Sequence, residues 1–82
     1  MPPEVHRVTL IGKPGCHLCD EARAVVAEVC GELGVPWDEV DVRSDPSLWA
    51  EHGDRIPVTL VDGEEHDFWR VRADALRAEL SR

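Results

Sequence analysis

The sequence predicts a single α/β domain with the element order strand, helix, strand, helix, strand, strand, helix. Short runs of β-branched and apolar residues alternate with segments whose apolar residues recur every three or four positions. A strand, a crossover helix and a second strand form a parallel pair, and a later hairpin adds antiparallel strands. These observations predict a mixed four-stranded sheet with helices on both faces, which is a three-layer sandwich.

The first half of the chain carries the clearest signals. Residues 5–11 are rich in β-branched side chains and end at Gly12, as expected of a strand. A helix is expected over about residues 16–33, because its apolar residues form one stripe at helical spacing. Pro36 prevents its continuation. Residues 37–42 then read as a second strand, with valines two positions apart.

A short second helix is expected after Asp45, which is a good N-cap residue, with Pro46 at its first position and Gly53 beyond its end. Residues 58–61 predict a third strand. The Asp-Gly pair at 62–63 predicts a hairpin turn into a fourth strand that runs to about residue 69.

The remainder of the chain, with apolar residues at helical intervals up to Leu80, predicts a closing helix. One domain is expected over residues 4–82, preceded by a flexible tail at residues 1–3. No internal repeat or linker interrupts it.

Composition narrows the function classes. Of the 82 residues, 9 are Lys or Arg and 17 are Asp or Glu, which gives a net charge of −8 with neutral histidines. Such a surface repels phosphate backbones, so we expect no nucleic-acid partner. No apolar run reaches the roughly 18 residues of a membrane span, and no secretory signal pattern is visible. We therefore expect a cytoplasmic protein with no membrane partner.

Two of the three cysteines, Cys16 and Cys19, lie three positions apart in "GKPGCHLCDEAR". A structural disulfide between them would close a very small loop and restrict the unfolded chain little. A zinc site needs four ligands, and Cys30 would lie roughly 16 Å further along the helix. No metal ligand is therefore assigned, although a metal ion or an iron–sulfur cluster bound by the same cysteines in a dimer stays as an alternative.

Reversible redox chemistry fits the two cysteines better. Cys16 falls at the start of the helix, where unpaired backbone N–H groups and the helix dipole favour a thiolate. Cys19 follows within the first turn, where it can attack a mixed disulfide formed at Cys16 and release the reduced substrate. His17 either adds positive charge beside the nucleophile or simply points to solvent. Leu18 is expected to face the core and to anchor the turn.

A strand, then "KPGCHLC" opening a helix, then "IPV" opening a hairpin, resembles the thioredoxin superfamily and most closely the glutaredoxin-like proteins. The resemblance covers almost the whole chain. It implies a thioredoxin/glutaredoxin-like fold and a thiol–disulfide oxidoreductase that reduces protein or glutathione mixed disulfides, with Cys16 as nucleophile and Cys19 as resolving thiol. The electron donor would be glutathione or a dedicated reductase.

The same resemblance implies the binding residues. Lys13 would help hold a glutathione carboxylate, and Pro57 would be a cis-proline that faces the cysteines. Ile56 would then offer its backbone N–H and C=O to a substrate, which could add like an extra strand. His17 completes the expected binding set. No tightly bound cofactor is expected, and glutathione is a candidate co-substrate.

The chain departs from glutaredoxins at two places. His17 and Leu18 replace the usual Pro-Tyr between the cysteines, and the stretch "DGEEHDFWRVRAD" lacks the paired glycines that follow the hairpin. The acidic residues of that stretch (Glu64, Glu65 and Asp67) would repel an anionic tripeptide if they face the site.

Three further expectations concern residues outside this set. Cys30 lies on the apolar stripe of the first long helix and is expected in the core. The tryptophans are expected in the core or at its rim, and Phe68 with Trp69 would form a partner-binding patch if exposed.

A thioredoxin-fold adaptor without redox activity is the other alternative function.

Overall fold

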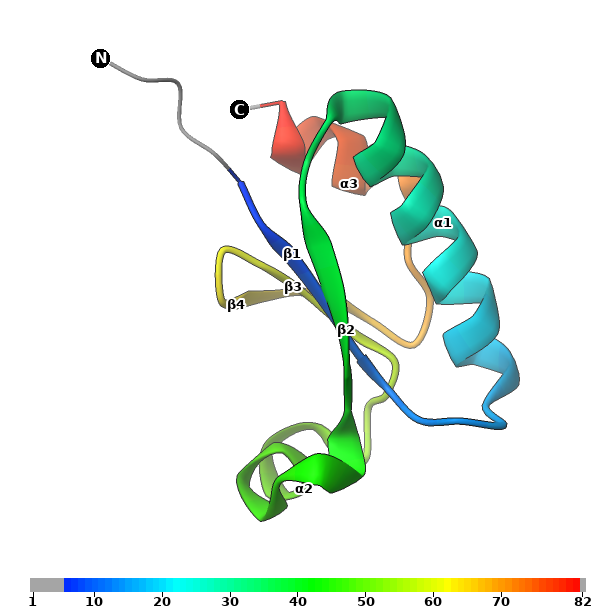
Figure 1. Cartoon of the computed structure of the whole chain (residues 1–82), viewed down its shortest axis with the longest axis vertical. Coiled ribbons are helices and arrows are strands. Elements are labelled where there is room, and N and C mark those ends of the chain that lie inside the picture. The colour runs from blue at the N-terminus through cyan, green and yellow to red at the C-terminus, as the bar shows by residue number, and fades with distance from the viewer. Residues whose placement is uncertain (1–5, 82) are drawn as a thin grey trace.

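The computed structural model describes residues 6–81. Its elements follow the predicted order, with one additional 3₁₀ turn (Figure 1). In chain order these elements are β1 (Val8–Gly12), α1 (His17–Leu33), β2 (Trp37–Asp41), η1 (Val42–Ser44), α2 (Pro46–His52), β3 (Val58–Val61), β4 (Glu64–Phe68) and α3 (Ala73–Leu80).

The four strands form one sheet in the order β2-β1-β3-β4. β1 pairs in parallel with β2, while β1 with β3 and β3 with β4 are antiparallel. The parallel pair needs a crossover, which α1 supplies, and the antiparallel pair needs only the turn at residues 62–63. The predicted mixed four-stranded sheet is confirmed.

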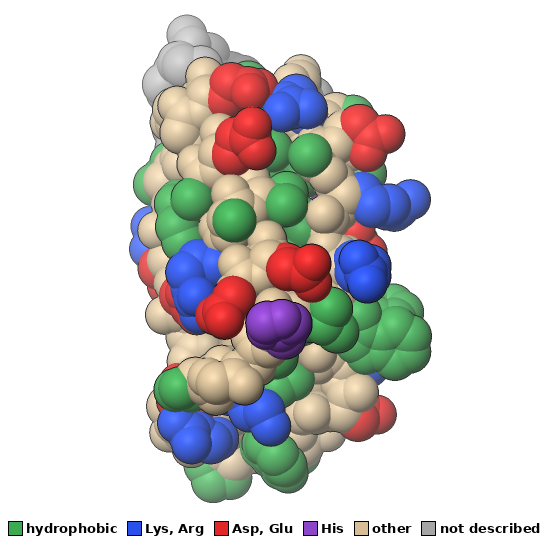
Figure 2. All heavy atoms as spheres, turned by 90° about the vertical axis from the view of Figure 1, so that its right-hand side faces the viewer, with side chains coloured by type: hydrophobic (Ala, Val, Ile, Leu, Met, Phe, Trp, Pro, Cys, Tyr) green, Lys and Arg blue, Asp and Glu red, His purple; other side chains and the backbone are tan. Residues whose placement is uncertain are grey.

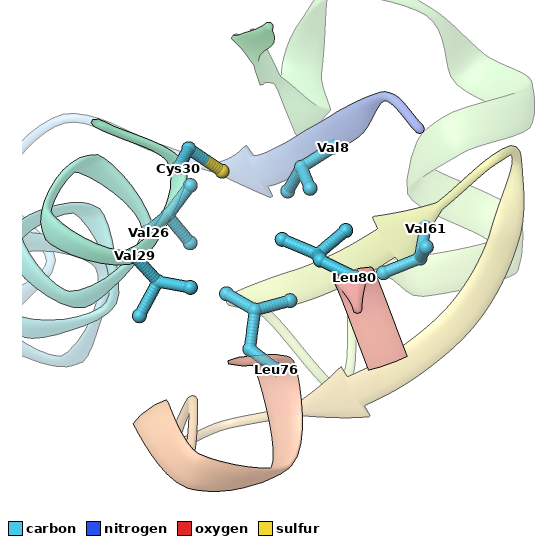
Figure 3. Packing of buried hydrophobic residues seen from close by; sticks show 7 residues of the cluster. All are labelled: Val8, Val26, Val29, Cys30, Val61, Leu76 and Leu80. Carbon is cyan, nitrogen blue, oxygen red and sulfur yellow. The ribbon is translucent and has the colours of Figure 1, made fainter. Parts of the chain in front are cut away.

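The helices lie on both faces of this sheet, as predicted. α1 and α3 pack beside each other on one face, and η1 and α2 follow the carboxyl end of β2 (Figure 1). The larger core cluster joins α1 and α3 to the sheet (Figure 3). Its members are Val8, Val26, Val29, Cys30, Val61, Leu76 and Leu80. A smaller cluster of Ile11, Val42 and Val58, with Leu48 of α2 against it, closes the other face.

α1 has the ends that its sequence predicts. Cys16 is the N-cap, and Gly34 ends the helix at φ +68, where its backbone N–H donates to the Cys30 carbonyl. A left-handed glycine is a common helix terminator because it satisfies a carbonyl that has no partner within the helix. Cys30 is 1% exposed. The expectation that it belongs to the core is confirmed.

Two boundaries differ from the prediction. The first strand begins at Val8, because Arg7 donates its backbone N–H to the Asp62 carboxylate. The second strand ends at Asp41 rather than Val42, because the Asp41 carboxylate accepts the Arg43 N–H at 2.8 Å and turns the chain into η1.

The predicted tail at residues 1–3 lies outside the described residues, so the domain start at residue 4 stays a prediction. Across residues 6–81, no helix has both the length and the apolar character needed to cross a membrane.

Candidate active site

Cys16 occupies the position that a serine or aspartate usually takes before a helix. Its backbone is extended, with φ −101° and ψ 118°, and its sulfur accepts a hydrogen bond of 3.2 Å from the Cys19 backbone N–H. The first amides of a helix have no partner within the helix, so a side-chain acceptor at this position satisfies one of them. The half-buried Cys16 sulfur thus lies where the positive end of the helix dipole stabilises negative charge.

The loop before Cys16 leaves this sulfur accessible. Lys13, Pro14 and Gly15 are all exposed. Gly15 has φ +73, a conformation that a side chain would disfavour. The chain can therefore turn sharply from β1 into α1 without covering Cys16.

Cys19 lies behind Cys16 and is fully buried. Burial raises the pKa of its thiol, a hydrogen bond with the Cys16 side chain also raises it, and the resulting pKa is about 11. A hydrogen bond with the Lys13 backbone acts in the opposite direction and favours the thiolate. Cys19 is therefore a protonated thiol at neutral pH, held next to Cys16.

Gly12 is a residue of the site that the sequence alone did not identify. A Cβ atom placed on Gly12 would lie 2.9 Å from Cys19 Sγ and 3.3 Å from Cys19 Cβ. Separations below 3 Å are too close for real contacts, so any larger residue would displace the sulfur. The only signal in the sequence was a glycine at the end of a strand, which was read as a strand terminator.

The Ile56–Pro57 peptide bond is cis, as the resemblance implied. Ile11 of β1 pairs with Val58 of the antiparallel strand β3. Gly12, which follows Ile11, and Pro57, which precedes Val58, therefore lie at the same end of the two strands. Within residues 6–81, neither the N–H nor the C=O of Ile56 has a hydrogen-bond partner. The backbone of Ile56 is thus free to pair with an added segment.

A groove of about 530 Å³ begins at Ile56 and at Leu18, the residue between the two cysteines that precedes Cys19. Its lining is Leu18, Ile56, Asp67, Phe68, Trp69, Arg70 and Arg72, and we call it the Trp69 groove. Leu18 was expected to face the core, but it is half-buried because the groove opens beside it. Figure 2, which views the molecule from the α1 side, shows hydrophobic side chains projecting at the surface near a histidine.

The six expected site residues separate into two groups. Cys16 and Cys19 are in contact. Ile56 and Pro57 lie at the end of the sheet where Gly12 packs against Cys19. The side chains of Lys13 and His17 are exposed, and neither forms an ion pair or a side-chain hydrogen bond with another described residue. Their roles in binding stay predictions.

The acidic stretch is less repulsive toward this site than its composition indicated. Glu64 lines a separate hollow with His66 and Glu79. Glu65 forms an ion pair with Arg55 at 3.2 Å. Of the three carboxylates only Asp67 lines the Trp69 groove, and it pairs with Arg72 at 3.4 Å. The two arginines compensate the charges of Glu65 and Asp67, and Glu64 does not line the Trp69 groove.

Arg70 and the backbone conformation of Trp69 are two features of the site that the sequence did not predict. Trp69 and Arg70 line the groove, yet nothing in the sequence indicates that Trp69 has a positive φ of 64°. Only the adjacent aromatic pair at 68–69 hinted at a binding surface. Among residues 6–81, no group of three or more His, Cys, Asp or Glu side chains is arranged to hold a metal ion.

Comparison with known proteins agrees with this architecture. Residues 7–81 match the family described as "Glutaredoxin-like domain (DUF836)". The uncharacterized protein Rv0508 of Mycobacterium tuberculosis is 40% identical over 81 residues, which cover 93% of this chain and 84% of that protein.

Two solved structures are also similar. The target protein XcR50 from X. campestris is 32% identical, with a TM-score of 0.73 over 90% of this chain and 95% of its own. A mutant thioredoxin from Halobacterium salinarum NRC-1 has a TM-score of 0.66 at 21% identity, over 93% of this chain and 72% of its own. The fold is thus the predicted thioredoxin-like fold, and the chain belongs to the glutaredoxin-like (DUF836) family.

Proposed function

We propose that this protein is a thiol–disulfide oxidoreductase in which Cys16 is the nucleophile and Cys19 the resolving thiol. The observation that carries the proposal is the arrangement of the two sulfurs. Cys16 Sγ accepts the Cys19 N–H at the start of α1, and the buried Cys19 thiol hydrogen-bonds with Cys16 from behind. The Cys16 sulfur lies at the N-terminus of α1, where the helix dipole stabilises negative charge, while the Cys19 thiol is buried and protonated.

The reaction proceeds in two exchanges. The Cys16 thiolate attacks one sulfur of a substrate disulfide, forms a mixed disulfide and expels the other substrate sulfur as a thiolate. Cys19 then loses its proton to that thiolate or to water and attacks Cys16 Sγ, which breaks the mixed disulfide. The two protein thiols lose two electrons and become a disulfide, and the substrate disulfide becomes two thiols.

Burial of Cys19 separates the roles of the two thiols in these exchanges. A buried, protonated thiol does not compete with Cys16 for the incoming disulfide. Once Cys16 is in the mixed disulfide, its negative charge is gone and with it part of the cause that raises the Cys19 pKa. The Lys13 backbone hydrogen bond then supports the Cys19 thiolate at the moment when that thiolate is needed.

The proposal includes a return of electrons from two glutathione molecules or from a reductase, in the reducing environment of the cytoplasm. Both the family and the thioredoxin-like fold support a role of this redox type. Lys13 and the exposed His17 would contact a glutathione or protein substrate on the approach to Cys16.

The test is reduction of hydroxyethyl disulfide and of insulin, with glutathione and thioredoxin reductase supplied in separate assays. We expect activity with at least one donor, its loss in Cys16→Ser, and an accumulated mixed disulfide in Cys19→Ser. Cys30→Ala is the matched control, because Cys30 is equally buried but belongs to the α1–α3 core. Full activity of Cys16→Ser would refute the proposal.

The cluster-binding alternative is checked in the same preparations. Anaerobic purification followed by iron, sulfide and zinc analysis should show no stoichiometric metal. Metal that is bound by the wild type, lost from both cysteine variants and accompanied by no disulfide reduction would assign the cysteines to a cluster instead. Unchanged partner binding in a double cysteine variant without any turnover would favour the adaptor.

A further inference from the structure

The wall of the Trp69 groove contains two exposed aromatic side chains. Trp69 is 52% exposed, and Phe68 beside it is 40% exposed, with the two rings in edge-to-face contact at 5.0 Å between centroids. A second hollow of about 230 Å³ shares Leu18, Trp69, Arg70 and Arg72 with the groove and continues along α1. Trp69 therefore stands between two adjoining hollows that together form an elongated surface starting beside the cysteine pair.

The backbone positions Trp69 through a conformation that is unfavourable for a bulky residue. Trp69 has φ +64, and the Arg70 N–H donates to the Phe68 carbonyl at 2.8 Å, which makes Trp69 the central residue of a γ-turn. Its own N–H donates to the Pro57 carbonyl at 2.7 Å. A positive φ is unfavourable for a bulky residue, and an exposed indole stabilises the fold little. Such a conformation commonly occurs where a side chain is positioned for binding.

The charges at the groove favour an acidic occupant. Of the Lys and Arg residues at positions 6–81, all but Lys13 and Arg70 form an ion pair with a carboxylate. Arg70 lines the groove, and the other unpaired cation, Lys13, lies three positions before Cys16 in the sequence. The charged lining of the groove is Asp67, Arg70 and Arg72, an excess of one positive charge in a chain of net charge −8.

We propose that the Trp69 groove binds the protein segment that flanks the reactive cysteine of the substrate, an inference that rests on the proposed oxidoreductase function. Trp69 and Phe68 contact a bulky apolar residue of that segment, and Arg70 pairs with an acidic residue next to it. The unpaired backbone of Ile56 provides hydrogen bonds for an extended chain, independent of its sequence. The substrates are thus protein disulfides with apolar and acidic neighbours.

Three peptides of equal length test the selectivity. Each carries one cysteine in a disulfide with 5-thio-2-nitrobenzoate, whose release reports the attack of Cys16. In the first peptide the cysteine is flanked on both sides by leucine and glutamate, in the second by leucine and lysine, and in the third by serine and glutamate. We expect kcat/KM to be about tenfold higher for the first than for either of the others, the effect of one well-placed anchor or ion pair.

Variants assign the preference to its residues. Trp69→Ala should abolish the preference for leucine over serine, and Arg70→Glu should reverse the preference for glutamate over lysine. Trp49→Ala is the matched control for the first, because Trp49 on α2 is also 52% exposed. Arg43→Glu changes the net charge as Arg70→Glu does, but at an arginine paired with Asp41 in η1. Neither control should change the preferences, and circular dichroism checks that all variants fold.

Hydroxyethyl disulfide separates the failure of this inference from failure of the function. It is too small to reach along the groove, so its reduction by the wild type measures the oxidoreductase reaction without contacts to flanking residues. Wild-type reduction of hydroxyethyl disulfide with equal rates for all three peptides would overturn the inference and leave the oxidoreductase intact. No reduction of any disulfide would overturn both.

Two other ligands of the groove, glutathione and a second copy of the chain, would give different results. If Trp69→Ala slows reduction of a glutathione–hydroxyethyl mixed disulfide and leaves the peptide preferences unchanged, the groove binds glutathione and the inference is wrong. If sedimentation shows a dimer that Trp69→Ala converts to a monomer, the occupant is a second copy of the chain, which also overturns it.

Discussion

Gly12 and Cys19 are packed so closely that a single methyl group on Gly12 would lie 2.9 Å from the Cys19 sulfur. The last residue of β1 therefore determines how far Cys19 can withdraw from Cys16. This contact links the central strand of the sheet to the chemistry at the start of α1, since neither residue can move without the other.

Gly12→Ala should accordingly alter both stability and exchange. We expect the free energy of unfolding to fall by about 1–3 kcal/mol, the usual cost of an additional methyl group in a packed interior. The mixed disulfide at Cys16 should also persist longer, because Cys19 is displaced from its line of attack. Urea denaturation and the decay of an isolated mixed disulfide measure the two effects.

Gly31→Ala is the control for this change. Gly31 lies near the end of α1 with open space around it, so alanine there should stabilise the helix by up to about 1 kcal/mol and leave the decay unchanged. Equal stability of Gly12→Ala and the wild type would show that Cys19 is not confined by this contact.

The cap formed by Cys16 predicts different stabilities for two inactive variants. Serine at position 16 can still accept the Cys19 N–H, whereas alanine leaves that amide without a side-chain acceptor. Cys16→Ala should therefore unfold with a free energy about 1 kcal/mol lower than Cys16→Ser. Thermal or urea denaturation of the two proteins provides the comparison, and identical midpoints would mean that the sulfur does not cap α1.

Cys19 should make the fold less stable at high pH. Because burial and the contact with Cys16 raise its pKa from 9.0 to about 11, the unfolded chain loses this proton at a lower pH than the folded chain does. Between these two values the folded protein binds more protons, so the free energy of unfolding falls as the pH rises, by at most about 1.4 kcal/mol per unit.

Urea denaturation at a series of pH values between 8 and 11.5 should show a smaller slope for Cys19→Ala than for the wild type. Burial also raises the Cys30 pKa, so part of the slope should remain in the variant. A slope unchanged by Cys19→Ala would mean that this thiol ionises as easily in the folded as in the unfolded chain.

The γ-turn at Trp69 predicts that glycine is better tolerated there than alanine. Both variants lose the indole, but only glycine adopts φ +64 without a steric penalty. Trp69→Gly should therefore have a free energy of unfolding about 1 kcal/mol higher than Trp69→Ala. At position 49, within α2, the order should be reversed, because alanine is the better helix residue.

Much of the fold could be read from local patterns. The apolar stripe of α1, the Asp45–Pro46 helix start and the Asp-Gly turn each depend on residues close together in the chain, and the structure confirms all three. The cis bond at Pro57 was implied only by the resemblance, because nothing about an isolated X-Pro pair distinguishes the two isomers strongly. Leu18 was placed wrongly, since its surroundings depend on where Trp69 and Ile56 lie.

The sequence by itself determined the element order, the position of Cys16 at the head of a helix and the spacing that brings Cys19 behind it, because helix caps and periodicity are local properties. Only the tertiary structure decided that Gly12 confines Cys19, that Glu65 is neutralised by Arg55, and that Trp69 and Arg70 border the site. These relations join residues on different elements, and their distances are determined by how the sheet and helices pack.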